Sequence, residues 1–223
     1  MKQSKYFTNF GRAWPAMAIL LTFAFVYAGC SGLIDSPPQS TTEHDVRAYY
    51  LKLDNTGNQY YYSVQQPSTD KLVMAMKGDY VGQGYDGVET YDCQWNFTQS
   101  NKQEEWYFAV DSAAAFDLGS DAPWSGMPWA DTNVWVDLQA PLAANASWTF
   151  NYEGDSIIAK VTAYGVPVTL GNKQYNDVVQ VQYTGKQNSG VKWFARGIGE
   201  IFESVDASFG HLERSLDSCS IKS

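Results

Sequence analysis

The stretch Thr90-Tyr-Asp-Cys-Gln-Trp-Asn-Phe97 alternates polar residues with large apolar ones. Successive side chains of an extended chain point to opposite faces, so Tyr91, Cys93 and Trp95 share one face with Phe97. One apolar and one polar face are typical of a strand in an antiparallel sheet, because strands of parallel sheets are buried on both sides. The stretch therefore predicts a sheet with a single buried face.

The same alternation recurs along the chain from residue 46 onward, and short turn signals rich in Gly, Asn and Asp separate the runs. Besides 90–97, the predicted strands are 46–53, 59–65, 71–76, 104–110, 134–138, 148–152, 156–163, 166–170, 179–183, 192–195, 199–204 and 209–216. Long helical periodicity is lacking. We therefore expect an all-β fold of about a dozen strands, arranged as an antiparallel sandwich or a strongly curved half-barrel.

Three short motifs recur in the same order at a spacing of roughly 87 to 90 residues. The pairs are Tyr60-Tyr-Tyr62 with Trp148-Thr-Phe150, Tyr85-Asp-Gly-Val88 with Tyr175-Asn-Asp-Val178, and Trp106-Tyr-Phe-Ala109 with Trp193-Phe-Ala195. One interpretation is that residues 46–120 and 134–216 are two similar β-units joined through Asp121–Asn133. The other is that short aromatic strands match by chance.

Residues 1–29 predict an export signal. Lys2, Lys5 and Arg12 are their only charged residues, and the apolar run Ala16–Ala28 follows. A basic start, a short apolar middle and small residues at the end are typical of secretory signals. The run is shorter than the roughly 20 apolar residues that a membrane-spanning helix needs. We therefore expect a water-soluble all-β domain over residues 44–223, outside the cytoplasm.

The residues before Cys30 resemble the lipobox of bacterial lipoproteins, in which small residues precede a cysteine that becomes lipid-modified. Ala28 and Gly29 match this pattern, whereas Tyr27 stands where an aliphatic residue is usual. The resemblance implies cleavage before Cys30, acylation of the mature chain with fatty acids such as palmitate, and anchorage to a membrane. The alternative is ordinary cleavage after Ala28, with Val26 as the second small residue.

A tether is expected between this anchor and the domain, over residues 30–43. The stretch Ser31–Glu43 is rich in Pro, Ser and Thr, which is typical of flexible linkers. Ser31 after the cysteine, where the usual sorting pattern of lipoproteins has aspartate for inner-membrane retention, favours the outer membrane or the cell surface. The sequence therefore predicts a lipid-anchored protein of the cell envelope.

The charge of the chain excludes some partners. The export signal holds three of the 15 basic residues and none of the 24 acidic ones, so the mature chain has 12 basic and 24 acidic residues. Contacts with phosphate need clustered Lys and Arg, so we expect neither nucleic acid nor an anionic membrane surface as a partner.

The three cysteines are Cys30, Cys93 and Cys219. If Cys30 carries lipid, an even pair remains, and an oxidising compartment favours a disulfide between Cys93 and Cys219. The alternative is two buried thiols. Neither cysteine lies in a Cys-x-x-Cys motif, so redox catalysis is not expected.

The second half resembles uncharacterised bacterial envelope lipoproteins. The motifs that carry the likeness are Pro141-Leu142, Ser147-Trp148, Tyr175-Asn-Asp-Val178 and Trp193-Phe-Ala-Arg-Gly-Ile-Gly199. The match covers about 60 residues, and its motifs are structural, so it implies a compartment and a β-fold but no activity. Asn145 departs from the pattern, which has glycine there. Some envelope lipoproteins with this strand pattern resemble half-barrels that carry lipids or lipoproteins.

Motifs for catalysis and metal binding are missing from the sequence. His44 and His211 are the only histidines, and neither His-Glu-x-x-His nor Gly-x-Ser-x-Gly occurs. The run Asp54-Asn-Thr-Gly-Asn58 lacks the closing glutamate of a calcium loop and reads as a turn. Gly197 and Gly199 predict a tight turn between strands, because a phosphate-binding loop would need a helix after it. We therefore expect no cofactor.

Carboxylates offer the remaining route to catalysis. Pairs such as Glu104 with Glu105, or Asp70 with Asp79, could in principle serve as acid and base, but a general acid and base must lie at a defined separation. Nothing in the sequence brings either pair to such a separation. We therefore expect that the protein is not an enzyme, with a hydrolase as a minor alternative.

The most unusual segment, Asp121–Trp135, holds three tryptophans among Pro and Gly. Loop tryptophans such as Trp124 and Trp129 can form a platform for a sugar or a protein partner, because they offer large area with few torsions. The alternative is that they fill the core, and Trp135, which begins a predicted strand, is the best candidate for burial.

These observations predict a lipid-anchored envelope protein that acts by binding or scaffolding. The alternatives are a carrier that holds an apolar ligand in a concave sheet, a glycan-binding surface module that uses Trp124 and Trp129, and a hydrolase with unrecognised carboxylates. The membrane, reached through the lipid, is one expected partner, and an apolar ligand, a glycan or an envelope protein is the other.

Overall fold

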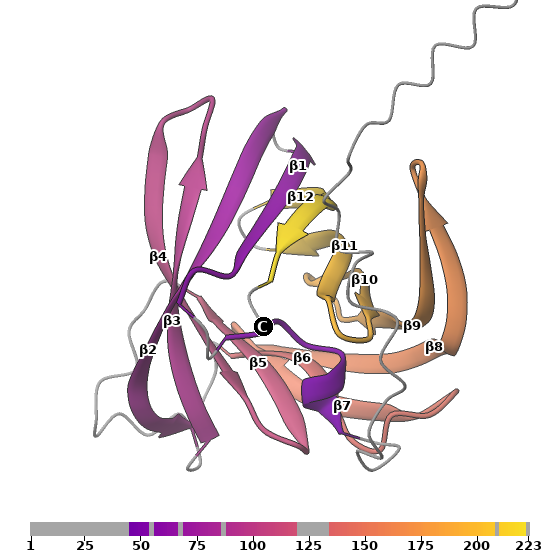
Figure 1. Cartoon of the computed structure of the whole chain (residues 1–223). Helices are drawn as coiled ribbons and strands as arrows, with labels where there is room; N and C mark the ends of the chain where they lie inside the picture. The colour runs from indigo at the N-terminus through magenta and orange to yellow at the C-terminus, as the bar shows by residue number, and fades with distance from the viewer. Residues whose placement is uncertain are drawn as a thin grey trace, which may run out of the picture.

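A computed structural model of the chain describes residues 45–53, 56–66, 69–85, 88–119, 134–207 and 210–221. In these ranges twelve strands form one antiparallel sheet that curls into a nearly closed barrel, which confirms the all-β prediction and favours its curved form (Figure 1). A short 3-10 helix, η2 (Val46–Ala48), precedes the strands. The strands are β1 (Gln59–Gln66), β2 (Asp70–Tyr85), β3 (Val88–Phe97), β4 (Lys102–Val110), β5 (Ala114–Gly119), β6 (Trp135–Gln139), β7 (Ser147–Tyr152), β8 (Asp155–Leu170), β9 (Lys173–Thr184), β10 (Ser189–Ala195), β11 (Gly199–Ala207) and β12 (Gly210–Ser220).

The strand order is a continuous meander. Each strand is hydrogen-bonded to its neighbours in the sequence, except that β6 does not pair with β7, and β12 closes back onto β1, so that the order is β6-β5-β4-β3-β2-β1-β12-β11-β10-β9-β8-β7. The sheet therefore consists of two halves, β1–β6 and β7–β12, which share the β1–β12 ladder. Strands β6 and β7 are the two edges of the sheet and face each other across a seam.

Most predicted strands are confirmed, with three differences. Residues 156–163 and 166–170 are one strand, β8, whose ladder with β9 contains register shifts that let it bend without breaking. Strand β5 was not predicted, because Ala114–Gly119 is too short and too rich in small residues to show an alternation. The segment 46–53, predicted as a strand, is not one in the structure.

That segment enters the barrel instead of joining its wall, and we call Asp45–Leu53 the plug. Adjacent residues Tyr49 and Tyr50 are both buried, which a strand with one exposed face does not allow. The plug bridges corresponding turns of the two halves. Val46 N donates to Ser112 O of the β4–β5 turn (3.1 Å), and Gly197 N of the β10–β11 turn donates to Ala48 O (2.7 Å).

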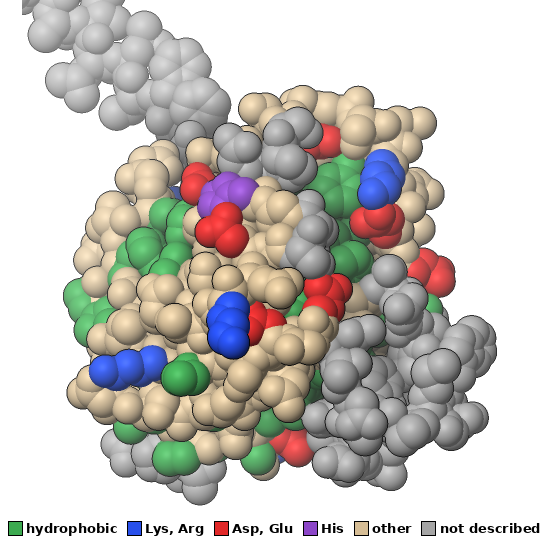
Figure 2. Space-filling view, turned by 180° about the vertical axis from the view of Figure 1, so that it is seen from behind, with side chains coloured by type: hydrophobic (Ala, Val, Ile, Leu, Met, Phe, Trp, Pro, Cys, Tyr) green, Lys and Arg blue, Asp and Glu red, His purple; other side chains and the backbone are tan. Residues whose placement is uncertain are grey.

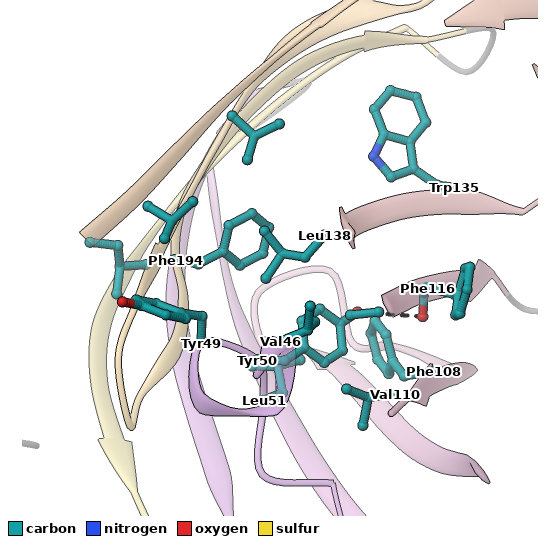
Figure 3. Close-up of a cluster of buried hydrophobic side chains, with 14 of the residues drawn as sticks. Val46, Tyr49, Tyr50, Leu51, Phe108, Val110, Phe116, Trp135, Leu138 and Phe194 are labelled. Atoms are coloured by element: carbon teal, nitrogen blue, oxygen red, sulfur yellow. Dashed lines mark hydrogen bonds between the residues drawn. The ribbon is translucent and has the colours of Figure 1, made fainter. Parts of the chain in front are cut away.

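The core of the barrel forms around the plug (Figure 3). The ring of Tyr50 packs between Phe108 of β4 and Phe194 of β10, with both centroid distances at 6.3 Å. At Gly199 a Cβ atom would lie 2.9 Å from a side-chain carbon of Leu51, so only glycine lets the plug lie this close to β11. Gly199 has φ of 109°, which agrees with the predicted turn there.

The two halves fasten their turns in the same way. Asp70, the first residue of β2, accepts the backbone N–H of Gln99 (2.9 Å) in the β3–β4 turn and the hydroxyl of Ser100 (2.8 Å). Asp155, the first residue of β8, accepts the backbone N–H of Gln187 (2.8 Å) in the β9–β10 turn. In both halves, therefore, the carboxylate at the start of one strand accepts hydrogen bonds from the turn that joins the next two strands. The backbone N–H donors of that turn lower the pKa of Asp155 to about 2.

The halves also bulge at matching places. The β4–β5 ladder shifts register between Tyr107 and Phe108, and the β10–β11 ladder shifts between Trp193 and Phe194. These positions belong to one of the motif pairs that suggested a repeat. The repeat itself, with its boundaries at 46–120 and 134–216, stays a prediction, and the linking segment Asp121–Asn133 lies almost wholly outside the described residues.

Among the residues that the structure describes, no helix has the length and the apolar character to cross a bilayer. On the face that Figure 2 shows, the coloured Lys, Arg, Asp and Glu side chains are scattered and do not gather into a patch of one sign. Ile158 of β8 is the exposed large hydrophobic residue in the described ranges, at 54%.

Candidate functional site

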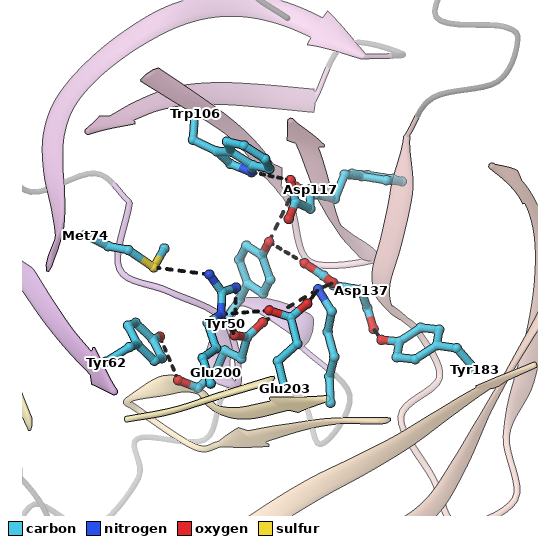
Figure 4. Close-up of polar contacts among 12 residues, drawn as sticks. Tyr50, Tyr62, Met74, Trp106, Asp117, Asp137, Tyr183, Glu200 and Glu203 are labelled. Atoms are coloured by element: carbon cyan, nitrogen blue, oxygen red, sulfur yellow. Dashed lines mark hydrogen bonds and ion pairs between the residues drawn. The ribbon is translucent and has the colours of Figure 1, made fainter. Parts of the chain in front are cut away.

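Six ionisable side chains meet inside the barrel, and we call them the ionic belt (Figure 4). They are Asp117 of β5, Asp137 of β6, Lys192 of β10, Glu200 and Glu203 of β11, and Arg214 of β12. All are buried except Asp117, which is partly buried. Charged side chains are rarely buried unless they are paired, so their partners decide what the belt can do.

Lys192 is the centre of the belt. Its ammonium nitrogen lies 2.8 Å from Asp137 Oδ1, 2.9 Å from Glu203 Oε1 and 3.7 Å from Glu200 Oε2. The contact with Asp137 links β10 in one half to β6 in the other, across the interior. Burial alone would lower the pKa of Lys192, but Asp137, Glu203 and Glu200 raise it well above its ordinary value.

Arg214 supplies the second positive charge. Its guanidinium lies 2.9 Å from Glu200 Oε1 and 2.7 Å from Glu203 Oε2, and it stacks over the ring of Trp95 at 4.8 Å. Burial would raise the pKa of Glu203, but Arg214 and Lys192 outweigh it and lower that pKa. Glu203 is thus the firmly ionised carboxylate of the belt.

Asp117 has neutral donors where the other carboxylates have cations. It accepts the indole N–H of Trp106 (2.5 Å) and the backbone N–H of Gly119 (3.0 Å). Burial raises its pKa to about 6, and the negative charge of Asp137 adds to this effect, while Lys192 opposes it. Asp117 therefore titrates near neutral pH.

Glu200 titrates higher still. Burial raises its pKa to about 8, and the neighbouring Glu203 adds to the rise against the opposing effects of Arg214 and Lys192. The belt thus has four carboxyl groups for two cations, and its two weakest acids hold protons over part of the neutral range.

Tyrosines connect the belt to the plug and to the wall. The hydroxyl of Tyr50, from the plug, donates to Asp137 Oδ2 (2.7 Å), and the hydroxyl of Tyr183 donates to the backbone carbonyl of Asp137 (2.6 Å). Tyr62 of β1 donates to the carbonyl of Glu200 (2.8 Å). Plug, belt and both halves of the barrel are therefore one hydrogen-bonded unit.

A second cluster holds the plug from its other side. The hydroxyl of Tyr49 donates to Asp177 Oδ1 (2.7 Å), and Arg196 donates to Asp177 Oδ2 (2.7 Å) while its guanidinium lies over the ring of Tyr49 at 4.8 Å. Asp177 has φ of 65°, which asparagine and aspartate tolerate better than most residues. The plug is thus fixed by two polar anchors as well as by packing.

The predicted disulfide between Cys93 and Cys219 is wrong for this structure, in which Cys93 is a free, fully buried thiol. Cys93 lies on β3 and Cys219 on β12, with β2 and β1 between them. Three strand spacings amount to about 14 Å, whereas disulfides need Cα atoms within about 7 Å. Burial raises the pKa of the Cys93 thiol far above its ordinary value, so the thiol is inert. Cys219 is also buried, and it has an interaction of its own.

Several other predicted site residues lie outside the described part of the chain. Cys30, the expected lipidation site, and Trp124 and Trp129, the candidate ligand platform, belong to this group, as does His44. Trp135 is described and buried, as expected, at 7% exposure.

Of the candidate catalytic carboxylates, Asp70, Glu104 and Glu105 each have a partner of their own, and the side chain of Asp79 lies outside the described part of the chain. Asp70 fastens a turn, Glu104 pairs with Lys102, and Glu105 pairs with Lys77 on the outside of the barrel. His211 lies at the surface, 2.8 Å from Asp206. Within the described ranges, no three His, Cys, Asp or Glu side chains are placed to hold a metal ion.

The belt was missed because the sequence favours the wrong face of β10. Trp193 with Ala195 was the more apolar alternation, yet the structure buries Lys192 and Phe194, while Trp193 is only half-buried and packs against Phe202 outside. A usable signal was present, since Lys192, Glu200 and Glu203 lie close in a sequence whose charged residues are otherwise scattered.

Comparisons with known proteins give little. Neither the profiles of known protein families nor the sequences of curated proteins match this chain. Among solved structures, the chain is similar to a candidate lipoprotein from Parabacteroides distasonis, at 10% identity and a TM-score of 0.42, over 78% of this chain and 99% of that one. At that TM-score the likeness carries no argument about this chain.

Proposed function

We propose that this chain is an exported lipoprotein, anchored to the envelope through Cys30, whose barrel acts by binding or scaffolding and not by catalysis. The export signal and the lipobox-like residues support the anchor, and the filled interior of the barrel supports the mode of action. The outer membrane or the cell surface is the proposed location, because Ser31 follows the cysteine.

The start of the folded body limits where the barrel can act. The plug begins at Asp45, fifteen residues after Cys30. An extended chain spans at most about 3.5 Å per residue, so the tether reaches no more than about 50 Å. An anchored barrel therefore stays close to its membrane, where it can meet a partner on the same surface.

The observation that carries the proposed mode of action is the occupancy of the barrel interior. A carrier needs an apolar space for its ligand, but here the plug and the ionic belt stand inside the wall, and Tyr50 touches both halves. Asp137, Glu200 and Glu203 of the belt are buried inside the wall, which does not suit acid-base catalysis on a substrate from solution. A rigid, filled barrel is suited to present its outside to a partner.

Mass spectrometry of the full chain, expressed with its own signal in a bacterium that processes lipoproteins, tests the anchor. We expect the mature N-terminal peptide to begin at Cys30 and to carry a diacylglyceryl mass, and the intact protein to partition into detergent. Cys30→Ala should move the protein to the aqueous phase. Cys93→Ala, which removes a thiol that plays no part in anchoring, is the matched control and should stay in the detergent phase.

Three results would overturn parts of this proposal. A mature chain that begins at Gly29 without lipid, or a peptide in which Cys30 is joined to Cys219 by a disulfide, would remove the anchor. An acyl-chain or other apolar mass retained in the native spectrum, beyond the covalent lipid, would replace the scaffold by a carrier.

A further inference from the structure

The charge balance of the ionic belt differs from that of an ordinary buried ion pair. Asp117, Asp137, Glu200 and Glu203 face only Lys192 and Arg214, so two negative charges lack a counterpart when all four carboxyls are ionised. An uncompensated buried charge is costly, and a buried acid avoids the cost by keeping its proton. The belt is therefore expected to hold protons at a pH where exposed carboxylates have lost theirs.

The groups that face Glu200 come from every neighbouring element. They are Lys192 from β10, Glu203 from β11 itself, Arg214 from β12, Asp137 from β6, Tyr62 from β1, Tyr183 from β9 and Tyr50 from the plug. Among the described groups that face Glu200, Lys192 and Arg214 are the positive ones, and Glu203 pairs with both, at 2.9 and 2.7 Å, while Glu200 lies 3.7 and 2.9 Å from them. Ionised Glu200 would have to compete with Glu203 for the same two cations.

The plug is coupled to this balance through one carboxylate. Asp137 receives the hydroxyl of Tyr50 on one oxygen and the ammonium of Lys192 on the other. Ionisation of Glu200 adds a third negative carboxylate near Lys192, beside Asp137 and Glu203, which weakens the hold of the ammonium on Asp137 and brings negative charge toward the Tyr50 contact. Tyr50 is buried among the packed rings of both halves, so it cannot move aside without loosening the plug.

We propose that the ionic belt is a proton-binding site that holds the plug most firmly at mildly acidic pH and loosens it as the pH rises past neutral. The sign follows from linkage. A group that binds its proton more tightly in the folded than in the unfolded chain stabilises the fold at low pH, and this stabilisation disappears as the pH rises through its folded pKa. For both groups the stabilisation is complete below about pH 4, where the unfolded carboxyls are also protonated, and it is lost as the pH rises through about 6 for Asp117 and about 8 for Glu200.

Urea unfolding of the full mature chain between pH 5 and pH 8.5, at constant ionic strength, tests the proposal. The unfolding equilibrium constant should rise with pH, by about tenfold per unit where the folded chain holds one extra proton. Hydrogen exchange should show the amides of the plug, including that of Val46, exchanging faster at pH 8.5 after correction for intrinsic rates. A stability that is flat or rises over this range overturns the proposal without any variant.

Two variants test which carboxyl group of the ionic belt holds the extra proton. Glu200→Gln and Asp117→Asn keep the shape but cannot ionise, so at least one of them should flatten the pH dependence. An unchanged slope in both overturns the proposal. Glu153→Gln, in an exposed turn, is the matched control and should keep the slope. Because histidine ordinarily titrates in this range, all measurements belong in a His211→Gln background, where the slope should persist.

Discussion

The junction of β12 with β1 and the junction of β6 with β7 occupy corresponding places in the two halves, yet they are closed in different ways. Strands β12 and β1 form a ladder that runs from Gln59 with Ser220 to Gln66 with Glu213. Strands β6 and β7 form no ladder, and Trp135 of β6 instead packs on Phe150 and Tyr152 of β7 with centroid distances of 5.6 and 5.3 Å.

The difference teaches which interactions each junction depends on. Backbone hydrogen bonds close β12–β1 and tolerate many side chains, whereas the β6–β7 seam depends on particular rings and on the salt bridge between Asp137 and Lys192 behind them. The two halves share the carboxylates that bind their turns and the positions of their bulges. They differ at the seam and in the ionic belt. Substitutions can test this contrast.

The largest expected effect comes from the belt. Lys192→Met leaves three buried carboxylates without their shared cation, and we expect a loss of about 3–5 kcal/mol in the free energy of unfolding. In the first half Trp106 of β4 also contacts a carboxylate of the belt, Asp117, but its contact is a hydrogen bond between a neutral donor and a carboxylate. Trp106→Phe should therefore cost only about 1–2 kcal/mol. Urea unfolding at pH 7 compares the two, and equal losses would contradict the contrast.

The seam should respond next. Trp135→Leu removes the ring that joins β6 to β7, with an expected loss of about 2–3 kcal/mol, and hydrogen exchange should increase in β7 more than in β1. Leu216→Ala, a buried truncation on β12, is the matched variant at the other junction. It should cost a similar amount without faster exchange at the β1–β12 ladder, because the backbone pairing remains. If exchange became faster to the same extent at both junctions, the β6–β7 seam would not depend on particular side chains more than the β1–β12 junction does.

The smallest effect concerns the turns before β1 and β7. Gly57 N donates to Met76 O, and Asn145 N donates to Val161 O, and both residues have positive φ, at 102° and 67°. Gly57→Ala should cost about 1–2 kcal/mol, because an added Cβ disfavours that backbone. Asn145→Ala should cost about 0.5–1 kcal/mol, since the native residue already bears part of the strain. Thermal unfolding of both variants checks the order, and a reversed order would mean that the two turns are not equivalent.

The sequence predicted the parts of the fold that depend on local alternation. Runs such as Trp148 to Tyr152 gave strands at the right places, and Gly197 with Gly199 gave the turn between β10 and β11. It failed where tertiary contacts overrule alternation. Tyr49 and Tyr50 look like strand residues, but both are buried because their segment passes through the interior, where every side of the chain meets the wall.

The candidate site was hidden for a similar reason. Lys192, Glu200, Glu203 and Arg214 each look like outward-facing charges, since an isolated charged side chain favours water. Their burial is tolerated because the neighbouring strands β10, β11 and β12, together with the distant strand β6, bring opposite charges within 3 Å of one another. The predicted disulfide of Cys93 was wrong for the same reason, because the sequence spacing of two cysteines does not show how many strands lie between them in the sheet.

By itself, then, the sequence determined the β-class and the acidic character of the chain, and it predicted an export signal with a lipobox-like end, because periodicity and composition act through neighbouring residues. Only the tertiary structure decided that the meander closes on one side and leaves a seam on the other, and that the chain's own N-terminal segment fills the interior. Which charges meet there depends on the curvature and register of the whole sheet, and no short stretch of sequence contains either.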